Sequence, residues 1–135
     1  HLPDTRAEWS ARQPSAEERK LVEQFITAHE RLDTEAVIAI AARDIRVTMP
    51  PLPYCFQGTE AIRPLMADAA AMGEWRLVPA GANQMPAAAS YLRRPGDSVF
   101  RAFKLDVMRV EGAVIAEITT FPAGHFAAFG LQLTL

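Results

Sequence analysis

The first third of the chain carries apolar residues at the period of an α-helix. Ser15 is followed by Glu18 in the spacing of a capping box, and behind them apolar residues recur every three or four positions. Asp33 is placed to cap a second, short helix whose Val37 and Ile40 face inward. The apolar face of the first helix would consist of Leu21, Val22, Phe25, Ile26, His29 and Leu32. The pattern therefore predicts two successive helices.

A short strand and a third helix are predicted next. Apolar and polar residues alternate in RDIRVTMP, residues 43–50, as in a strand. The following stretch, PPLPYCFQG, has three prolines and should be neither helix nor central strand, because proline lacks the backbone N–H. Thr59 is placed to cap the third helix, and Pro64 should distort its start. The apolar set of this helix is Ala61, Ile62, Leu65, Met66 and Ala69.

The second half of the chain has the two-residue period of β-strands. Its apolar segments are separated by turn residues, among them Pro95-Gly96-Asp97 and Glu111-Gly112, where tight hairpins need them. The predicted strands are EWRLVPAGANQ, PAAASYLRR, SVFRAFKLDVMRV and AVIAEITTF. This order predicts an α+β fold, with three helices in residues 15–71 packed on a curved antiparallel sheet of residues 74–121.

Composition and charge narrow the classes of function. The chain has 135 residues, half of them hydrophobic, which suits one domain with a substantial core. The net charge is −2 and no basic run exceeds Arg93-Arg94, so a nucleic-acid surface is not indicated. No apolar run is long enough to span a membrane, no signal peptide opens the sequence, and Cys55 is the single cysteine. These features predict a soluble, cytoplasmic protein.

The sequence contains no motif for a metal or a cofactor. Its histidines, His1, His29 and His125, lack the close spacing of metal ligands, and no glycine-rich phosphate loop is present. We therefore expect neither a metal nor a cofactor. Because His29 lies on the apolar side of the first helix, we interpret it as a boundary histidine rather than a ligand.

Three carboxylates are candidates for chemistry. Asp44 opens a strand after a helix, which favours a capping or turn role, and Asp106 alternates with Lys104, which suggests a solvated pair. Glu117 shares strand parity with Ile115 and would face the interior if no bulge intervenes. Glu117 is therefore the best candidate for a buried acid or base, and a surface position on the sheet is the competing interpretation.

Three stretches resemble one known domain family: RDIRVTMPPLPYCFQGTEAI, WRLVPAGANQMPAAASYLRR and VEGAVIAEITTFPAGHFAAFGL. Their most specific parts are MPPLP, WRLVP..AN.....A.Y and F......FGL, and the resemblance covers residues 17–131. The pattern resembles the SnoaL-like domain that follows the promoter-binding regions of some bacterial extracytoplasmic-function (ECF) sigma factors. The resemblance implies the cystatin-like, nuclear-transport-factor-2-like (NTF2-like) cone fold. It also implies that residues 15–135 form the domain and that residues 1–14 are a linker from a preceding domain.

Two functions follow as hypotheses from this resemblance. The first is a non-catalytic regulatory domain in transcription initiation, whose partners are the promoter-binding regions of the parent sigma factor or RNA polymerase. A small apolar ligand and a second copy of the domain are further candidate partners. The alternative is a small SnoaL-like isomerase, cyclase or dehydratase, with Glu117 or His125 as proton carrier, because burial raises the pKa of a carboxylate toward the working range.

A ligand pocket is predicted inside the cone. Aromatic and apolar side chains would line it, and a few polar groups would orient the ligand. The candidate pocket residues are Tyr54, Trp75, Asn83, Tyr91, Glu117, Phe121 and His125.

The C-terminal stretch GHFAAFGL is predicted to form a plug. Phe126 and Phe129 are three residues apart, so one helical turn would direct both toward the same surface, and Gly130 would end that turn. We expect these two phenylalanines to close one end of the cone, with His125 at its rim.

The charge distribution predicts that residues 15–135, isolated from the parent chain, do not bind promoter DNA. The phosphate contacts that dominate non-specific affinity require a basic stripe, which this sequence lacks. Titration of duplex DNA at low salt should show no saturable binding at micromolar concentrations. Salt-sensitive micromolar binding would contradict the prediction.

Overall fold

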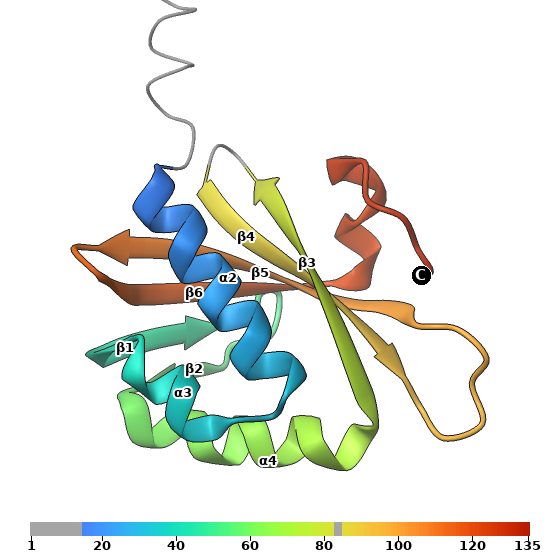
Figure 1. The fold of residues 1–135 in the computed structure, drawn as a ribbon, viewed down its shortest axis with the longest axis horizontal. Coiled ribbons are helices and arrows are strands. Elements are labelled where there is room, and N and C mark those ends of the chain that lie inside the picture. Colours follow the sequence, from blue (N-terminus) through green and yellow to red (C-terminus); the bar gives the residue numbers. More distant parts are fainter. Residues whose placement is uncertain (1–14, 83–84) are drawn as a thin grey trace, which may run out of the picture.

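The computed structural model describes residues 15–82 and 85–135, and it places helices on one face of a six-stranded sheet (Figure 1). The predicted linker, residues 1–14, lies outside the described part. The first half contains α2 (Ala16–Glu30), α3 (Thr34–Ala39), β1 (Ala41–Thr48), β2 (Cys55–Gln57), a 3-10 turn (Thr59–Ala61) and α4 (Ile62–Met72). The second half contains β3 (Glu74–Ala82), β4 (Met85–Arg93), β5 (Arg101–Glu111), β6 (Val114–Pro122) and two 3-10 turns (Ala123–His125 and Ala127–Phe129). The predicted α+β fold is confirmed.

The strand order of the sheet is β2-β1-β6-β5-β4-β3. β3 to β6 form an antiparallel meander, as the alternation predicted, and β2 is an edge strand antiparallel to β1. β1, for whose pairing the sequence made no prediction, pairs in parallel with β6. Local alternation carries no information about this pairing, because it joins segments far apart in the sequence.

The helix starts agree with the predicted caps at two of three places. The N–H of Glu18 donates to Ser15 Oγ (3.1 Å), and the N–H of Ser15 donates to Glu18 Oε1 (2.9 Å). Asp33 caps α3 with its carboxylate. Thr59 does not cap α4 but begins the 3-10 turn that precedes it. Pro64 is tolerated as the third residue of α4, because the first N–H groups of a helix lack intrahelical partners.

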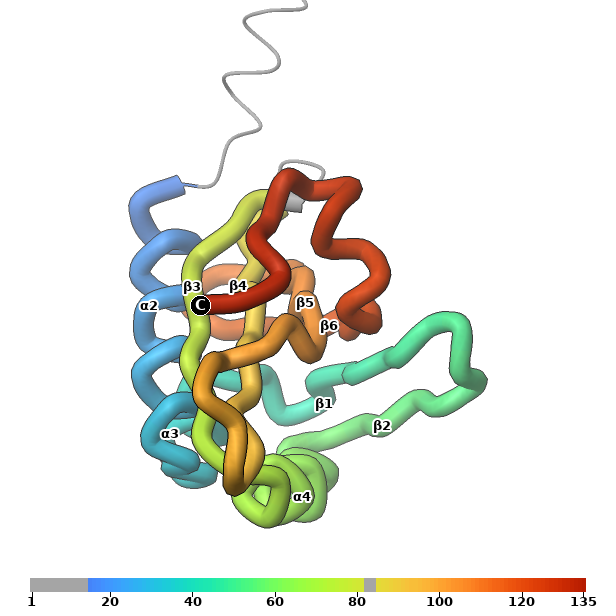
Figure 2. The backbone as a smooth tube through the Cα atoms, turned by 90° about the vertical axis from the view of Figure 1, so that its right-hand side faces the viewer, coloured from blue at the N-terminus to red at the C-terminus, as the bar shows by residue number. Residues whose placement is uncertain are grey.

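The two faces of the sheet bury separate apolar clusters. The inner cluster lies between sheet and helices and includes Val22, Phe25, Val37, Ile45, Met66, Trp75, Leu77, Leu92, Met108 and Ile118. The outer cluster lies on the opposite face, which the C-terminal segment covers, and consists of Ala87, Ala89, Tyr91, Leu105, Val107 and Phe126 (Figure 2). Because β4 is covered on both faces, its sequence is almost continuously apolar.

A one-residue bulge in β5 changes which residues face the helices. Ser90 of β4 lies opposite Lys104, whereas the next residue, Tyr91, lies opposite Ala102. Phe103 is therefore an extra residue in β5. Phe103 and Lys104 both face the inner side, although they are adjacent in sequence.

A second bulge, in β6, decides the orientation of Glu117. Arg109 of β5 lies opposite Glu117, and Val110 lies opposite Ile115, which leaves Ala116 as the extra residue. Ile115 faces the inner cluster. The strand parity that would have turned Glu117 inward is therefore broken between these two residues.

Among residues 15–82 and 85–135, no helix is long and apolar enough to cross a membrane.

Gly73 fixes the tight connection between α4 and β3. Its φ is 144°, which L-residues with a side chain rarely adopt, and a Cβ atom there would lie 2.4 Å from the carbonyl oxygen of Arg93. α4 can therefore lead directly into β3 only with glycine at this position.

We predict that Gly73→Ala destabilises the protein by roughly 2–4 kcal/mol, through backbone strain and the clash with Arg93. The free energy of unfolding in urea measures the effect. Gly124→Ala is the matched control, because its Cβ atom would meet no atom within 4 Å and its φ is not positive. Equal stabilities of the two variants would show that the connection does not require glycine.

Candidate functional site

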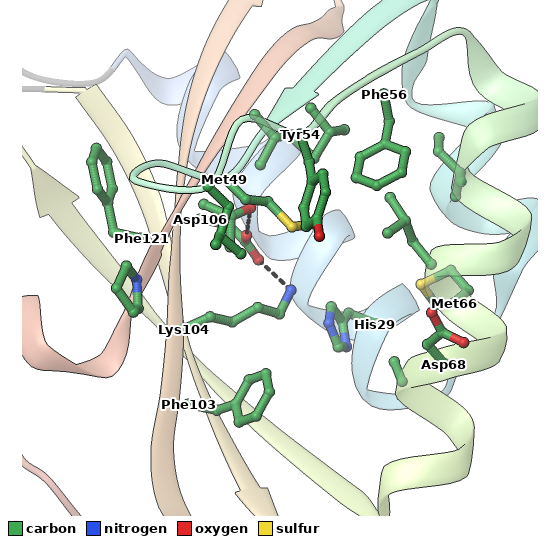
Figure 3. Close-up of a pocket in the computed structure, with 18 of the residues that line it drawn as sticks. His29, Met49, Tyr54, Phe56, Met66, Asp68, Phe103, Lys104, Asp106 and Phe121 are labelled. Carbon is green, nitrogen blue, oxygen red and sulfur yellow. Dashed lines mark hydrogen bonds and ion pairs between the residues drawn. The ribbon is translucent and has the colours of Figure 1, made fainter.

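A pocket of about 790 Å³ lies between the helices and the inner face of the sheet (Figure 3). α2 and α4 contribute one side, β5 and β6 another, and the loop between β1 and β2 a third. The lining is mostly apolar and includes Phe25, Met49, Phe56, Met66, Phe103 and Ile118. A pocket of this volume and lining is typical of small-molecule sites.

A buried ion pair supplies the main polar feature of the pocket. Lys104 Nζ lies 2.7 Å from Asp106 Oδ2, and the hydroxyl of Thr120 donates to Asp106 Oδ1 at 2.7 Å. Asp106 is 1% exposed, and all three residues line the pocket. We call this group the Lys104–Asp106–Thr120 triad. Asp106 needs both Lys104 and Thr120, because burying a charged carboxylate without hydrogen-bond partners costs much free energy.

His29 faces the triad from α2 and is 3% exposed. Burial, and secondarily the positive charge of Lys104, lower its pKa from 6.5 to about 4, although Asp106 acts in the opposite direction. The imidazole is therefore neutral near pH 7. Its Nδ1 is buried and has no hydrogen-bond partner.

Trp75 joins three elements at one end of the pocket. Its Nε1–H donates to the carbonyl oxygen of Ala69 on α4 at 2.8 Å. Its ring lies edge-on to His29 (centroids 5.0 Å apart) and to Phe103 (5.2 Å). Lys104 Nζ lies 5.8 Å from the centroid of the Trp75 ring, within range of a cation–π interaction. Trp75 thus holds α4 and α2 against β5.

Three of the candidate pocket residues, Tyr54, Trp75 and Phe121, are among the residues that line the pocket. The other candidates with described side chains, Tyr91, Glu117 and His125, are not among the lining residues. Asn83 lies outside the described residues.

The registers of the sheet explain where Tyr91 and Glu117 lie instead. Leu77, which faces inward, is opposite Ser90, so Tyr91 points to the other face. Its hydroxyl donates to the carbonyl oxygen of Gln132 at 2.7 Å. Glu117 is turned by the bulge in β6 and lies in register with the exposed Arg46 and Arg109.

The structure places the predicted plug on the outer face of the sheet. Phe126 is fully buried in the outer cluster, with its ring edge-on to Tyr91 at 5.4 Å, and Phe129 packs against the same cluster. Gly130 ends the turn with a φ of 69°, as its position suggested. His125 is exposed and its ring contacts Phe121 at 5.1 Å. The segment covers the face opposite the pocket, because the strand pairing leaves apolar side chains there.

The polar residues of the pocket were misjudged from the sequence. Asp106 was expected in a solvated pair, and His29 at a boundary, but both are buried. The neighbours of Asp106, Leu105 and Val107, face the other side of the strand, so alternation directed Asp106 away from them; only its shared parity with the apolar Met108 pointed to burial. No local signal placed His29 opposite the triad.

In the part of the chain that the structure describes, no cluster of histidine, cysteine or carboxylate side chains is arranged to hold a metal ion.

The chain is similar in sequence to a bacterial transcription factor. It is 31% identical over 125 residues to the ECF RNA polymerase sigma factor SigG of Mycobacterium tuberculosis, in two strains. The aligned part is 90% of this chain and 33% of the relative, so the chain spans about a third of the relative's length. No protein-family model matches the chain.

Solved structures of the NTF2-like type have the same fold. A putative ketosteroid isomerase from Kribbella flavida superposes with a TM-score of 0.63 at 17% identity, covering 82% of this chain and 80% of that one. An NTF2-like protein of unknown function from Burkholderia pseudomallei gives 0.63 at 19% identity, with 85% and 98% covered. An epoxide hydrolase of M. tuberculosis gives 0.62 at 16% identity, with 80% and 84% covered. At these identities the similarity concerns the fold alone.

The lowered pKa of His29 predicts a loss of stability in mild acid. The unfolded chain binds a proton at His29 below about pH 6.5, whereas the folded chain does so only below about pH 4. Stability is therefore lost as the pH falls through this window, by about 2 kcal/mol between about pH 7.5 and pH 5. Urea unfolding of His29→Leu should show a correspondingly smaller loss. His125→Gln, at an exposed histidine, is the control and should lose as much stability as the parent protein. If His29→Leu loses as much stability as the parent, the loss does not come from protonation of His29.

Proposed function

We propose that this chain, a homologue of part of an ECF RNA polymerase sigma factor with the NTF2-like fold, is a non-catalytic regulatory domain in transcription initiation. The observation that carries the proposal is the sequence similarity to SigG, which extends over most of the chain. The domain would comprise residues 15–135, with residues 1–14 as the linker to the promoter-binding regions. It would act in the cytoplasm, through those regions or through RNA polymerase.

The polar groups of the pocket favour binding over catalysis. Asp106 accepts hydrogen bonds on both carboxylate oxygens, one from Lys104 and one from Thr120, so a substrate proton would compete with an existing contact. Glu117 and His125, the proton carriers of the enzymatic hypothesis, do not line the pocket.

A small isomerase, cyclase or dehydratase is the second candidate function. It is favoured by one observation, a carboxylate that is 1% exposed in a largely apolar pocket. In that case Asp106 or His29 would carry the proton. Such an enzyme would lose turnover on Asp106→Asn, whereas a regulatory domain has no turnover to lose.

The regulatory proposal predicts that removal of residues 15–135 from the parent sigma factor changes promoter-dependent transcription. The assay uses purified RNA polymerase and a promoter that the parent sigma factor recognises. We expect the initiation rate to change by at least about fivefold, which is the lower end of the range for energetic coupling between two sites. Transcription by the polymerase without sigma factor is the control and should not respond to the isolated domain. An unchanged rate after the deletion would refute a regulatory role.

A further inference from the structure

We propose that the pocket binds a neutral, mostly hydrocarbon small molecule that carries one hydroxyl group, held between Lys104 and His29. This inference concerns the domain itself and does not depend on a role beside RNA polymerase. It rests on the shape and lining of the pocket and on the hydrogen-bonding groups at its polar end.

The apolar part of the pocket reaches the surface at the β1–β2 loop. Leu52 and Tyr54, both lining residues, are 54% and 55% exposed, so this rim leaves apolar surface in contact with water. A hydrocarbon body that extends from the interior to the rim would remove this surface from water, which is the main source of affinity in such sites.

Lys104 supplies a hydrogen-bond donor at the polar end. Figure 3 shows its ammonium group between Asp106 and His29. One of its three N–H groups is directed to Asp106 Oδ2, and ammonium donates but does not accept. A ligand oxygen placed here would therefore act as an acceptor.

His29 can form a second hydrogen bond with the same ligand oxygen. Its neutral imidazole has one donor and one acceptor nitrogen, so the nitrogen that meets the ligand either donates a hydrogen bond or accepts one. A hydroxyl group donates and accepts, so it matches Lys104 and either form of the imidazole at once. A carbonyl oxygen only accepts and would match the imidazole in only one form.

The charges around the pocket favour a neutral ligand. Lys104 and Asp106 neutralise each other, and an additional charge would lose hydration without gaining a free counter-ion. Asp68 of α4, an exposed lining residue, would also repel an anion. Fatty acids and amines are therefore poorer matches than an alcohol of the same size.

A matched set of fluorescent probes tests this selectivity. The probes are 1-pyrenemethanol, pyrene-1-carboxylate and pyrene, which share one hydrocarbon body. Energy transfer from Trp75 to the bound pyrene ring reports binding, provided that Trp9, the other tryptophan, is changed to phenylalanine. We expect 1-pyrenemethanol to bind about tenfold more tightly than pyrene, which is the effect of one hydrogen bond to a charged group, and also more tightly than the carboxylate, whose charge gains no free counter-ion.

Two changes at the polar end should weaken the preference without removing the pocket. Lys104→Met with Asp106→Asn deletes the ion pair and leaves no unpaired charge, so this variant should bind 1-pyrenemethanol and pyrene with similar affinity. His29→Leu keeps the donor Lys104 and should show a smaller preference than the parent. Lys20→Met, at the exposed side of α2, should behave like the parent. If one of the two pocket variants folds poorly by circular dichroism, the other carries the test.

The proposal is overturned if no probe gives saturable energy transfer, or if the carboxylate or the hydrocarbon binds as tightly as the alcohol. It is also overturned if a folded pocket variant keeps the full preference. None of these results bears on transcription, so they are distinct from a failure of the regulatory proposal.

Discussion

The pocket depends on the one-residue bulge at Phe103 in β5. In a regular strand Phe103 and Lys104 would lie on opposite faces, but the bulge directs both toward the helices. Every residue after it then changes face relative to the residues before it. Leu105 joins the outer cluster, and Asp106 joins the pocket. Lys104 and Asp106 share a face by regular alternation, and the bulge adds Phe103 to that face, next to the ion pair.

The outer face of the same sheet is stabilised by the C-terminal segment. Phe126 is fully buried there, which contributes about 2–3 kcal/mol by area. The end of the segment is tied to the start of β5, since the N–H of Leu135 donates to the carbonyl oxygen of Phe100 at 2.8 Å and the reverse pair is 3.1 Å. The sheet therefore has a covered outer face, and none of the residues that follow Pro122 lines the pocket on its inner face.

The two proposals fit together through the elements around the pocket. α2, α4 and the β1–β2 loop all line it and also form part of the molecular surface. A ligand that favours one arrangement of these elements would change the surface offered to the rest of a sigma factor or to RNA polymerase. Such coupling needs no chemical step. It agrees with a pocket whose buried carboxylate is already engaged by Lys104 and Thr120.

The sequence by itself determined the local elements, because their signals act within a few residues: the capping box at Ser15, the cap at Asp33, the alternation of β3 to β6 and the turn at Gly130. The tertiary structure alone decided the parallel pairing of β1 with β6 and the two bulges. A bulge changes the face of every later side chain, and its position depends on packing on both sides of the sheet. The bulge in β6 turned Glu117 away from the predicted pocket, and the register of β4 against β3 turned Tyr91 to the outer face. Strand pairing placed Asp106 on the inner face, and the packing of α2 on the sheet brought His29 beside it.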